Sequence, residues 1–137
     1  MEEKYFYEVS VKFTVLDVKG NEKPVTEKYL VVATTFSDAE SRLIDKGDVI
    51  RIRRTNIYHN LFLDTSEPGF VYIVTLKVIA EDENTGKDIT RKYNIAVETF
   101  EMEDAKIVAK SCAISELNNI KFRDVESIKR TDIVRII

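Results

Sequence analysis

The side chains that most often carry catalysis or bind metals are scarce in this chain of 137 residues. It has one histidine, His59, and one cysteine, Cys112. A zinc site built from cysteines, an intramolecular disulfide and a metal site shared by two histidines are therefore excluded, and His59 is the sole candidate base for a catalytic triad. The four glycines occupy turns or the end of a helix, which does not fit a phosphate-binding loop. We expect a protein that is not an enzyme and has no metal and no cofactor.

Two further features have structural explanations. Asp82, Glu83 and Asp88 gather in one predicted turn and could attract a cation, but solvated loop carboxylates are much commoner. Cys112 lies in a stretch with helical spacing, where a small buried apolar residue is expected.

Basic side chains recur at matching places in the two halves of the chain, next to hydroxyl residues such as Thr26 and Thr90. The six are Lys12, Lys28, Arg54, Lys77, Lys92 and Arg130. Basic and hydroxyl side chains on an open sheet can follow a phosphate backbone, and an aromatic ring can stack on bases. The aromatic candidates are Phe6, Tyr58 and Phe62. The first hypothesis is therefore a binding module for nucleic acid, single-stranded DNA in particular.

Two alternatives stay open. Lysines on a sheet face also keep it solvated, and Glu8, Glu27 and Glu98 would weaken a basic field. The other alternative is a protein-interaction or assembly module, such as a homodimer. It rests on apolar residues whose parity places them on the outer face, namely Leu30, Val32, Ile73 and Ile79. Such a strip indicates a partner surface, or helices that pack over parts of both faces.

Alternating apolar residues over Tyr5–Val15 predict a half-buried strand, followed by a turn and a second strand over Val25–Ala33. A helix should begin near Phe36, with Thr35 or Ser37 as its cap, Ser37 and Glu40 as a capping box and Phe36 as a hydrophobic staple. Gly47 should end this helix, and a third strand should run from Val49 to about Leu63.

The same succession then repeats. Strands are predicted over Phe70–Ala80 and Ile89–Val97, followed by a helix with Ala105, Val108, Ala109 and Cys112 on one stripe. A closing strand should cover Val125–Ile137. Identical residues recur when Tyr7–Val15, Val25–Phe36 and Asp48–Leu61 are laid on Tyr72–Ala80, Ile89–Phe100 and Asp124–Ile137.

This repetition predicts an α+β fold of two duplicated ββαβ units. The repeats would cover about residues 4–63 and 70–137, with six mainly antiparallel strands and two helices. We expect one domain over residues 1–137, with pseudo-twofold symmetry, because neither half alone has enough faces to close a core.

Composition limits the other classes. The chain has 44% hydrophobic and 33% charged residues and a net charge of −3, which is typical of a globular protein with an ordinary surface. No apolar run approaches the ~20 residues that span a membrane, and the acidic start does not resemble a signal peptide. We therefore expect a cytoplasmic protein that does not engage membranes.

Several segments also resemble a family of small uncharacterised proteins of gut Bacteroidetes and their bacteriophages. The resemblance rests on Val25–Ala33, on Phe36–Glu40 and on the late Arg53–Ile57, within a similarity that covers essentially the whole chain. It implies a bacterial or phage-infected cell as the setting. It brings no catalytic residues to transfer.

Overall fold

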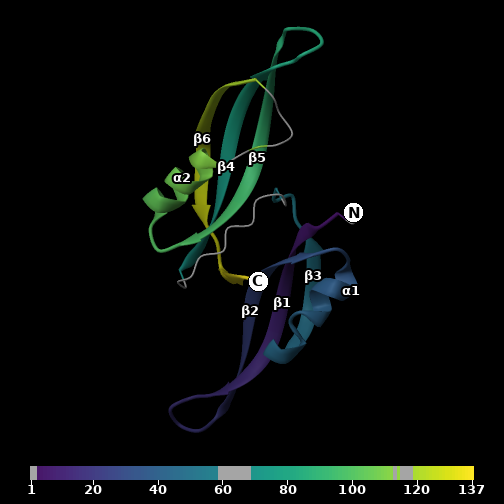
Figure 1. Ribbon diagram of the computed structural model, residues 1–137. Helices are drawn as coiled ribbons and strands as arrows, with labels where there is room; N and C mark the ends of the chain where they lie inside the picture. Colours follow the sequence, from purple (N-terminus) through teal and green to yellow (C-terminus); the bar gives the residue numbers. More distant parts are fainter. Residues whose placement is uncertain (1–2, 59–68, 113, 115–118) are drawn as a thin grey trace. The chain divides into compact units, whose positions relative to one another are not determined.

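The computed structural model describes residues 3–58, 69–112, 114 and 119–137 (Figure 1). Within them the order is β1 (Tyr5–Leu16), β2 (Glu22–Ala33), α1 (Phe36–Ser41), the 3-10 helix η1 (Ile44–Lys46), β3 (Asp48–Arg54), β4 (Phe70–Glu81), β5 (Asp88–Thr99), α2 (Met102–Ser111), β6 (Ile120–Arg130) and β7 (Ile133–Ile136). The predicted α+β class with two α-helices is confirmed. These residues contain seven strands where six were predicted.

The chain divides into two compact units. Unit 1 comprises Met1–His59 and Asp132–Ile137, and unit 2 comprises Asn60–Thr131. In each unit a long hairpin is followed by a helix and by a strand that pairs with the first hairpin strand. The strand orders are β3-β1-β2-β7 and β5-β4-β6. The single domain and the twofold relation between the units stay predictions.

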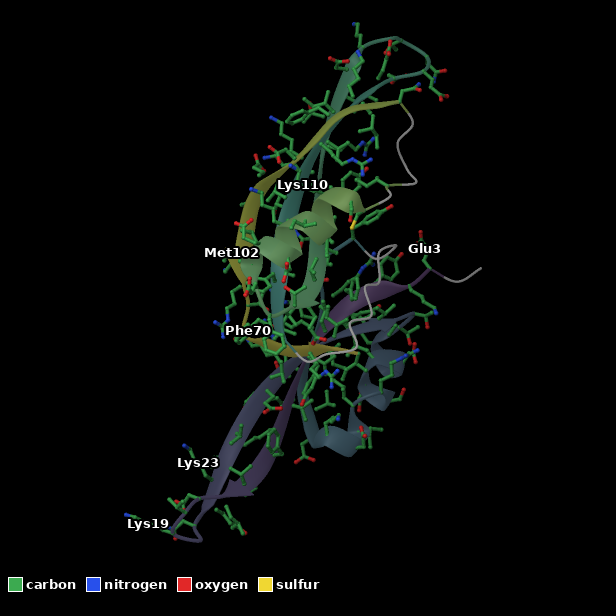
Figure 2. All side chains as sticks on the ribbon, turned by 60° about the vertical axis from the view of Figure 1, so that its left-hand side comes forward. Glu3, Lys19, Lys23, Phe70, Met102 and Lys110 are labelled. Carbon is green, nitrogen blue, oxygen red and sulfur yellow. The ribbon has the colours of Figure 1, made fainter. Side chains whose placement is uncertain are left out.

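Unit 1 buries one face of its sheet beneath α1. The side chains of this core come from alternate positions of β1 and β2 and from the helix region. They are Tyr7, Val9, Val11, Tyr29, Val31, Ala33, Ala39 and Leu43. This alternation confirms the predicted strands, because residues two apart on a strand point to the same face. The hairpin continues past α1 to a turn, and Figure 2 shows Lys19 and Lys23 at this end of the hairpin.

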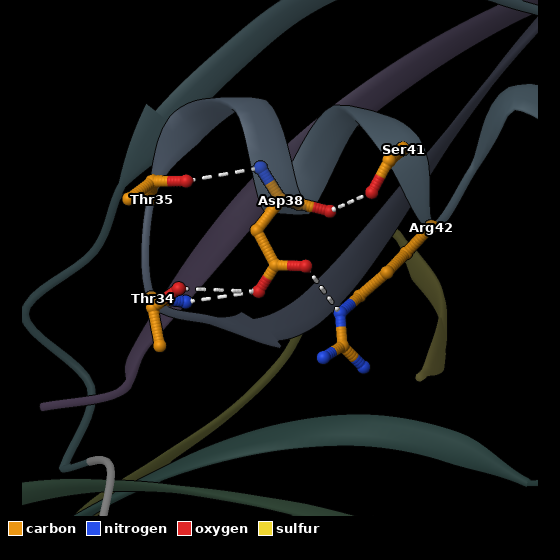
Figure 3. Close-up of polar contacts among 5 residues, drawn as sticks. All are labelled: Thr34, Thr35, Asp38, Ser41 and Arg42. Carbon is orange, nitrogen blue, oxygen red and sulfur yellow. Dashed lines mark hydrogen bonds and ion pairs between the residues drawn. The ribbon is translucent and has the colours of Figure 1, made fainter. Parts of the chain in front are cut away.

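Helix α1 begins at a side-chain cap centred on Thr35 (Figure 3). The Thr35 Oγ1 accepts a hydrogen bond from the N–H of Asp38 at 3.1 Å. The Asp38 carboxylate in turn accepts from the N–H of Thr34 at 3.2 Å and from Nε of Arg42 at 3.4 Å. These donors, the Thr34 N–H first, hold the pKa of Asp38 below its usual value. The cap is therefore Thr35, and the predicted capping box of Ser37 with Glu40 is wrong.

Phe36 is the first helical residue and does not precede the cap, so it is not the predicted staple. Its ring packs on Tyr7 at a centroid distance of 5.0 Å and stays half exposed.

Unit 2 packs α2 on the corresponding face of its sheet. Strand β4 buries Tyr72, Val74, Leu76, Val78 and Ala80 in strict alternation. The helix contributes Ala105 and Ala109, and Cys112 at its end is also buried, as the predicted stripe required. None of the helices in the described residues is long and apolar enough to cross a membrane.

The ends of the third strands differ from the prediction. Thr55 donates both its N–H and its Oγ1 hydroxyl to the carbonyl of Phe6, at 3.0 and 2.9 Å. Thr131 makes the same pair of bonds to Val71, at 3.0 and 2.8 Å. Strand β3 accordingly ends at Arg54, short of the predicted Leu63, which lies outside the described residues.

The predicted closing strand Val125–Ile137 is two strands. After Thr131 the chain leaves the sheet of unit 2, and Ile133–Ile136 forms β7 beside β2 in unit 1. Strand β7 runs parallel to β2, with Lys28 opposite Ile133 and Leu30 opposite Ile136. The mainly antiparallel sheets thus include one parallel pair.

Candidate nucleic-acid interface

The six predicted basic residues divide between the two faces of each sheet. Directly opposite residues of paired strands share a face. Arg54 lies opposite Tyr7 and Arg130 lies opposite Tyr72, so both arginines belong to the faces that the helices cover. The four lysines have the other parity. They lie on the face turned away from the helix, which we call the outer face of each unit.

Each arginine has its guanidinium over an aromatic ring. The guanidinium carbon of Arg54 is 3.4 Å from the ring centroid of Tyr5, and that of Arg130 is 3.5 Å from the centroid of Phe70. The two pairs occupy equivalent places in the two units. Each arginine directly precedes the threonine, Thr55 or Thr131, that donates two hydrogen bonds to one carbonyl. This geometry fixes the guanidinium by a cation–π contact at the edge of the core.

Lys28 and Lys92, which the sequence repeat equates, do not occupy equivalent places. Lys28 lies opposite Ser10, whereas Lys92 lies opposite Lys77. When the two hairpins are compared pair by pair, Lys77 opposite Lys92 corresponds to Lys12 opposite Thr26. Lys92 therefore takes the place of Thr26 and not that of Lys28. The turn of the second hairpin is longer than that of the first, and the pairing follows the turns and not the identities.

The outer face of unit 1 carries charges of both signs. Lys28 binds Asp132 at 2.9 Å, and this carboxylate raises the pKa of Lys28 above its ordinary value. Glu8, which lies two residues before Ser10 on β1, forms a salt bridge with Arg53 at 2.7 Å. Lys12 makes no salt bridge with the part of the chain that the structure describes. Its ammonium remains available on this outer face.

The outer face of unit 2 brings two lysines together. Lys77 on β4 lies directly opposite Lys92 on β5. Lys92 binds Glu126 at 2.9 Å, whereas Lys77 has no salt bridge among the described residues. Like charges directly opposite on a sheet are destabilising. Glu126 offsets the charge of Lys92, so the positive charge of this pair that has no carboxylate partner among the described residues is that of Lys77.

An acidic residue of β6 borders Lys77 on the side away from Lys92. Asp124 of β6 lies opposite Lys77, but its carboxylate lies 3.2 Å from the ammonium of Lys110 on α2. The N–H of Val125 and then Lys110 hold the pKa of Asp124 below its usual value. This carboxylate is thus already paired with a cation other than Lys77.

The rows on either side of the lysines carry polar and aromatic side chains. On one side Thr75 donates its hydroxyl to Oδ1 of Asn94 at 2.8 Å. On the other side Phe122 of β6 lies opposite Ile79, and its side chain is 48% exposed. Hydroxyl, amide, basic and aromatic groups therefore follow one another along this face.

The next row toward the turn ends the basic surface. Glu81 lies opposite Asp88, and Lys121 reaches both carboxylates, at 3.9 Å and 2.9 Å. Asp88 and then Glu81 raise the pKa of Lys121. A polyanion on the outer face would meet these two acids beyond Phe122.

Two of the three aromatic rings that were predicted to stack on bases are buried. Phe6 is 1% exposed and Tyr58 is 8% exposed, so neither ring can receive a base, and Phe62 lies outside the described residues. Phe122 was missed because the predicted closing strand began at Val125, whereas β6 begins at Ile120. The repeat gave no signal for it either, since the third-strand alignment begins at Asp124, after Phe122.

The predicted apolar outer strip is not an exposed surface. Leu30 is completely buried, and Val32, Ile73 and Ile79 are partly buried. Cys112 is buried as predicted, its thiol donates to the carbonyl of Val108 at 3.3 Å, and burial raises its pKa. His59 lies outside the described residues. Within those residues no group of three or more His, Cys, Asp or Glu side chains is placed to hold a metal ion.

Comparison with known proteins identifies a family. The family model of the domain of unknown function DUF4494 matches residues 5–137, and the chain belongs to this family. Neither a curated protein nor a solved structure matches the chain.

Proposed function

We propose that this member of a family of unknown function is a non-catalytic module that binds nucleic acid on the outer face of unit 2. The observation that carries the proposal is Lys77, an ammonium without a salt bridge among the described residues that faces a second lysine, Lys92. A phosphate beside the pair would bind the Lys77 ammonium directly and would compete with Glu126, 2.9 Å away, for the Lys92 ammonium. The hydroxyl of Thr90 on a neighbouring row can donate to a further phosphate oxygen, whereas that of Thr75 already donates to Asn94.

Unit 1 has no such pair of facing lysines. Lys28 is held by Asp132, as Lys92 is by Glu126, and the outer-face cations of unit 1 without a salt bridge to a described residue are Lys12 and Arg51, which lies opposite Ser10. Arg54 and Arg130 lie on the helix-covered faces, so a nucleic-acid strand that follows an outer face does not reach them. We assign these two arginines to the stability of the strand ends and the lysines to binding.

This division gives a charge-matched experiment. Each of two variants loses two positive charges: Lys77→Gln/Lys92→Gln and Arg54→Gln/Arg130→Gln. We expect the lysine variant to bind a labelled oligonucleotide more weakly and its plot of log K against log salt to lose about 1.4 in slope, about 0.7 per phosphate contact on a single strand. The arginine variant should keep the wild-type affinity and slope. Absence of binding by the wild-type protein at tens of micromolar in low salt, or equal losses in both variants, would refute the proposal.

The setting that we propose is the cytoplasm of a bacterium or of a phage-infected host. It follows from the resemblance of Val25–Ala33 and Phe36–Glu40 to the family of gut Bacteroidetes and their phages. A module without catalysis in that setting would coat or hold a nucleic acid and would not process it.

A second candidate function is assembly with another copy of the chain. The observation that favours it is the turn end of the first hairpin, where the apolar side chains Leu16 and Val18 are exposed, the former at 70%. Burial of both against a second copy would remove this apolar surface from water. Light scattering at micromolar concentration tests it: a dimer that Leu16→Ser/Val18→Ser dissociates supports assembly, and a monomeric wild-type protein refutes it.

A further inference from the structure

We infer that Phe122 is a base-stacking residue, and that the outer face of unit 2 therefore prefers single-stranded nucleic acid to a duplex. This inference rests on the proposed function and deepens it. Phe122 lies opposite Ile79 on β4, and Ile79 lies opposite Thr90 on β5. The lysine pair forms the adjacent row, two residues along each hairpin strand, which is about 7 Å away.

The surroundings of the ring suit an unpaired base. Phe122 is 48% exposed, so about half of this residue is open to contact by a base. Aromatic rings on an open sheet bind bases by stacking while neighbouring cations hold the backbone. In a duplex the bases already stack on one another, and a ring on a flat sheet does not reach their faces. Contact with Phe122 thus requires a single strand.

The acidic row limits how much nucleic acid this face can hold. Glu81 and Asp88 follow Phe122 toward the turn, and their one described cationic partner is Lys121. Between this row and the hydrogen-bonded Thr75 and Asn94 there are two rows, one basic and one with the aromatic ring. A site of this kind contacts about two or three nucleotides.

Unit 1 has no counterpart of this ring on its outer face. Beyond Lys12 and Thr26 the next row of the hairpin is Thr14 opposite Pro24, and neither is aromatic. Strand β3 ends its pairing with β1 at Asp48 opposite Lys12, so it supplies no residue to the Thr14 row. Stacking is therefore a property of unit 2, although both units carry lysines.

The chain contains no tryptophan, so a single introduced indole reports on this position alone. The test compares Phe122→Trp with Phe100→Trp, whose phenylalanine is 61% exposed but lies between β5 and α2. We expect an oligothymidylate of about 12 nucleotides to quench the indole at 122 and not the one at 100. A hairpin duplex of equal charge should quench neither.

Binding of Phe122→Leu separates this inference from the proposed function. We expect a loss of about 5- to 100-fold in affinity for the oligothymidylate. Phe100→Leu should show no loss, and an abasic oligomer should bind Phe122→Leu as it binds the wild-type protein. If the lysine variant is impaired but Phe122→Leu binds like wild type, or the duplex binds as tightly as the single strand, the inference fails alone. If the wild-type protein binds no oligonucleotide, both fail.

Discussion

Gly47 is the residue whose replacement should perturb unit 1 most for the smallest chemical change. Its φ is 148° and its ψ is −157°, a region that is essentially restricted to glycine. A Cβ at this position would lie 2.7 Å from the carbonyl oxygen of Lys12, 3.0 Å from Cγ1 of Val11 and 3.2 Å from Cβ of Phe13. The first of these atoms belongs to the backbone of β1, which cannot move without disturbing its pairing with β2 and β3.

Two costs add in the variant Gly47→Ala. Holding a non-glycine residue in this backbone region costs about 1–3 kcal/mol. Forcing an extra methyl group against a packed strand adds about 1–3 kcal/mol. The free energy of unfolding should therefore fall by about 2–6 kcal/mol, a large part of the stability of a domain of ordinary size.

Gly20 provides the matched control. It also has a positive φ, 81°, but a Cβ there would meet no atom within 4 Å. Gly20→Ala should thus cost only the backbone strain, about 1–2 kcal/mol. Urea unfolding followed by far-UV circular dichroism measures both variants. A loss for Gly47→Ala no greater than that for Gly20→Ala would show that the close approach to β1 does not exist.

Two further predictions concern side chains of unit 1. Thr35→Ala should lower the free energy of unfolding by about 1 kcal/mol, because the N–H of Asp38 loses its acceptor, whereas Ser37→Ala should change it little; urea unfolding measures both. Burial and then the hydrogen bond to Glu27 raise the pKa of Tyr29 from 10.0 to about 12. Because the folded state holds this proton more tightly, the stability from Tyr29 is complete below pH 10 and is lost as pH rises toward 12. Absorbance titration of the folded protein should show a late phenolate step that Tyr29→Phe lacks; an unchanged titration would refute the assignment.

The hairpins and helices could be predicted because each carries a local signal. Alternation over Tyr5–Val15 located β1, the turn at Gly20 located the first hairpin, and the stripe of Ala105 and Ala109 located α2. These signals arise from the residues that form the element and need no distant partner. The end of the third strand and the departure of β7 have no such signal. They depend on Thr55 and Thr131 bonding to carbonyls 49 and 60 residues away in the chain.

The candidate site was predicted less well for a related reason. Parity along a strand gives the face of a residue but not its neighbour across the sheet, which turn length and bulges decide. The lysines were therefore assigned to the correct faces, whereas Arg54 and Arg130 follow a bulge that changes the parity of the third strand. Lys77 opposite Lys92 could not be foreseen, because identity matching placed Lys92 with Lys28.

Identical residues in the two halves thus recur for different reasons. The dipeptide Lys28-Tyr29 returns as Lys92-Tyr93 but is shifted by two residues in the pairing, which preserves the face of each side chain. Both tyrosines stay buried, at 7% and 6% exposure, so core packing accounts for the recurrence. The shift changes what faces the lysine, from Ser10 in unit 1 to Lys77 in unit 2.

The arginine–aromatic pairs show the opposite behaviour, since they occupy equivalent places in both units and lie on the faces that the helices cover. A feature that both units need in order to fold should recur at equivalent places. A feature that opposes folding and occurs in one unit requires another explanation. Lys77 opposite Lys92 meets both conditions, because like charges face each other there and unit 1 has Lys12 opposite Thr26 instead. The proposed binding of an anion at this pair would supply that explanation.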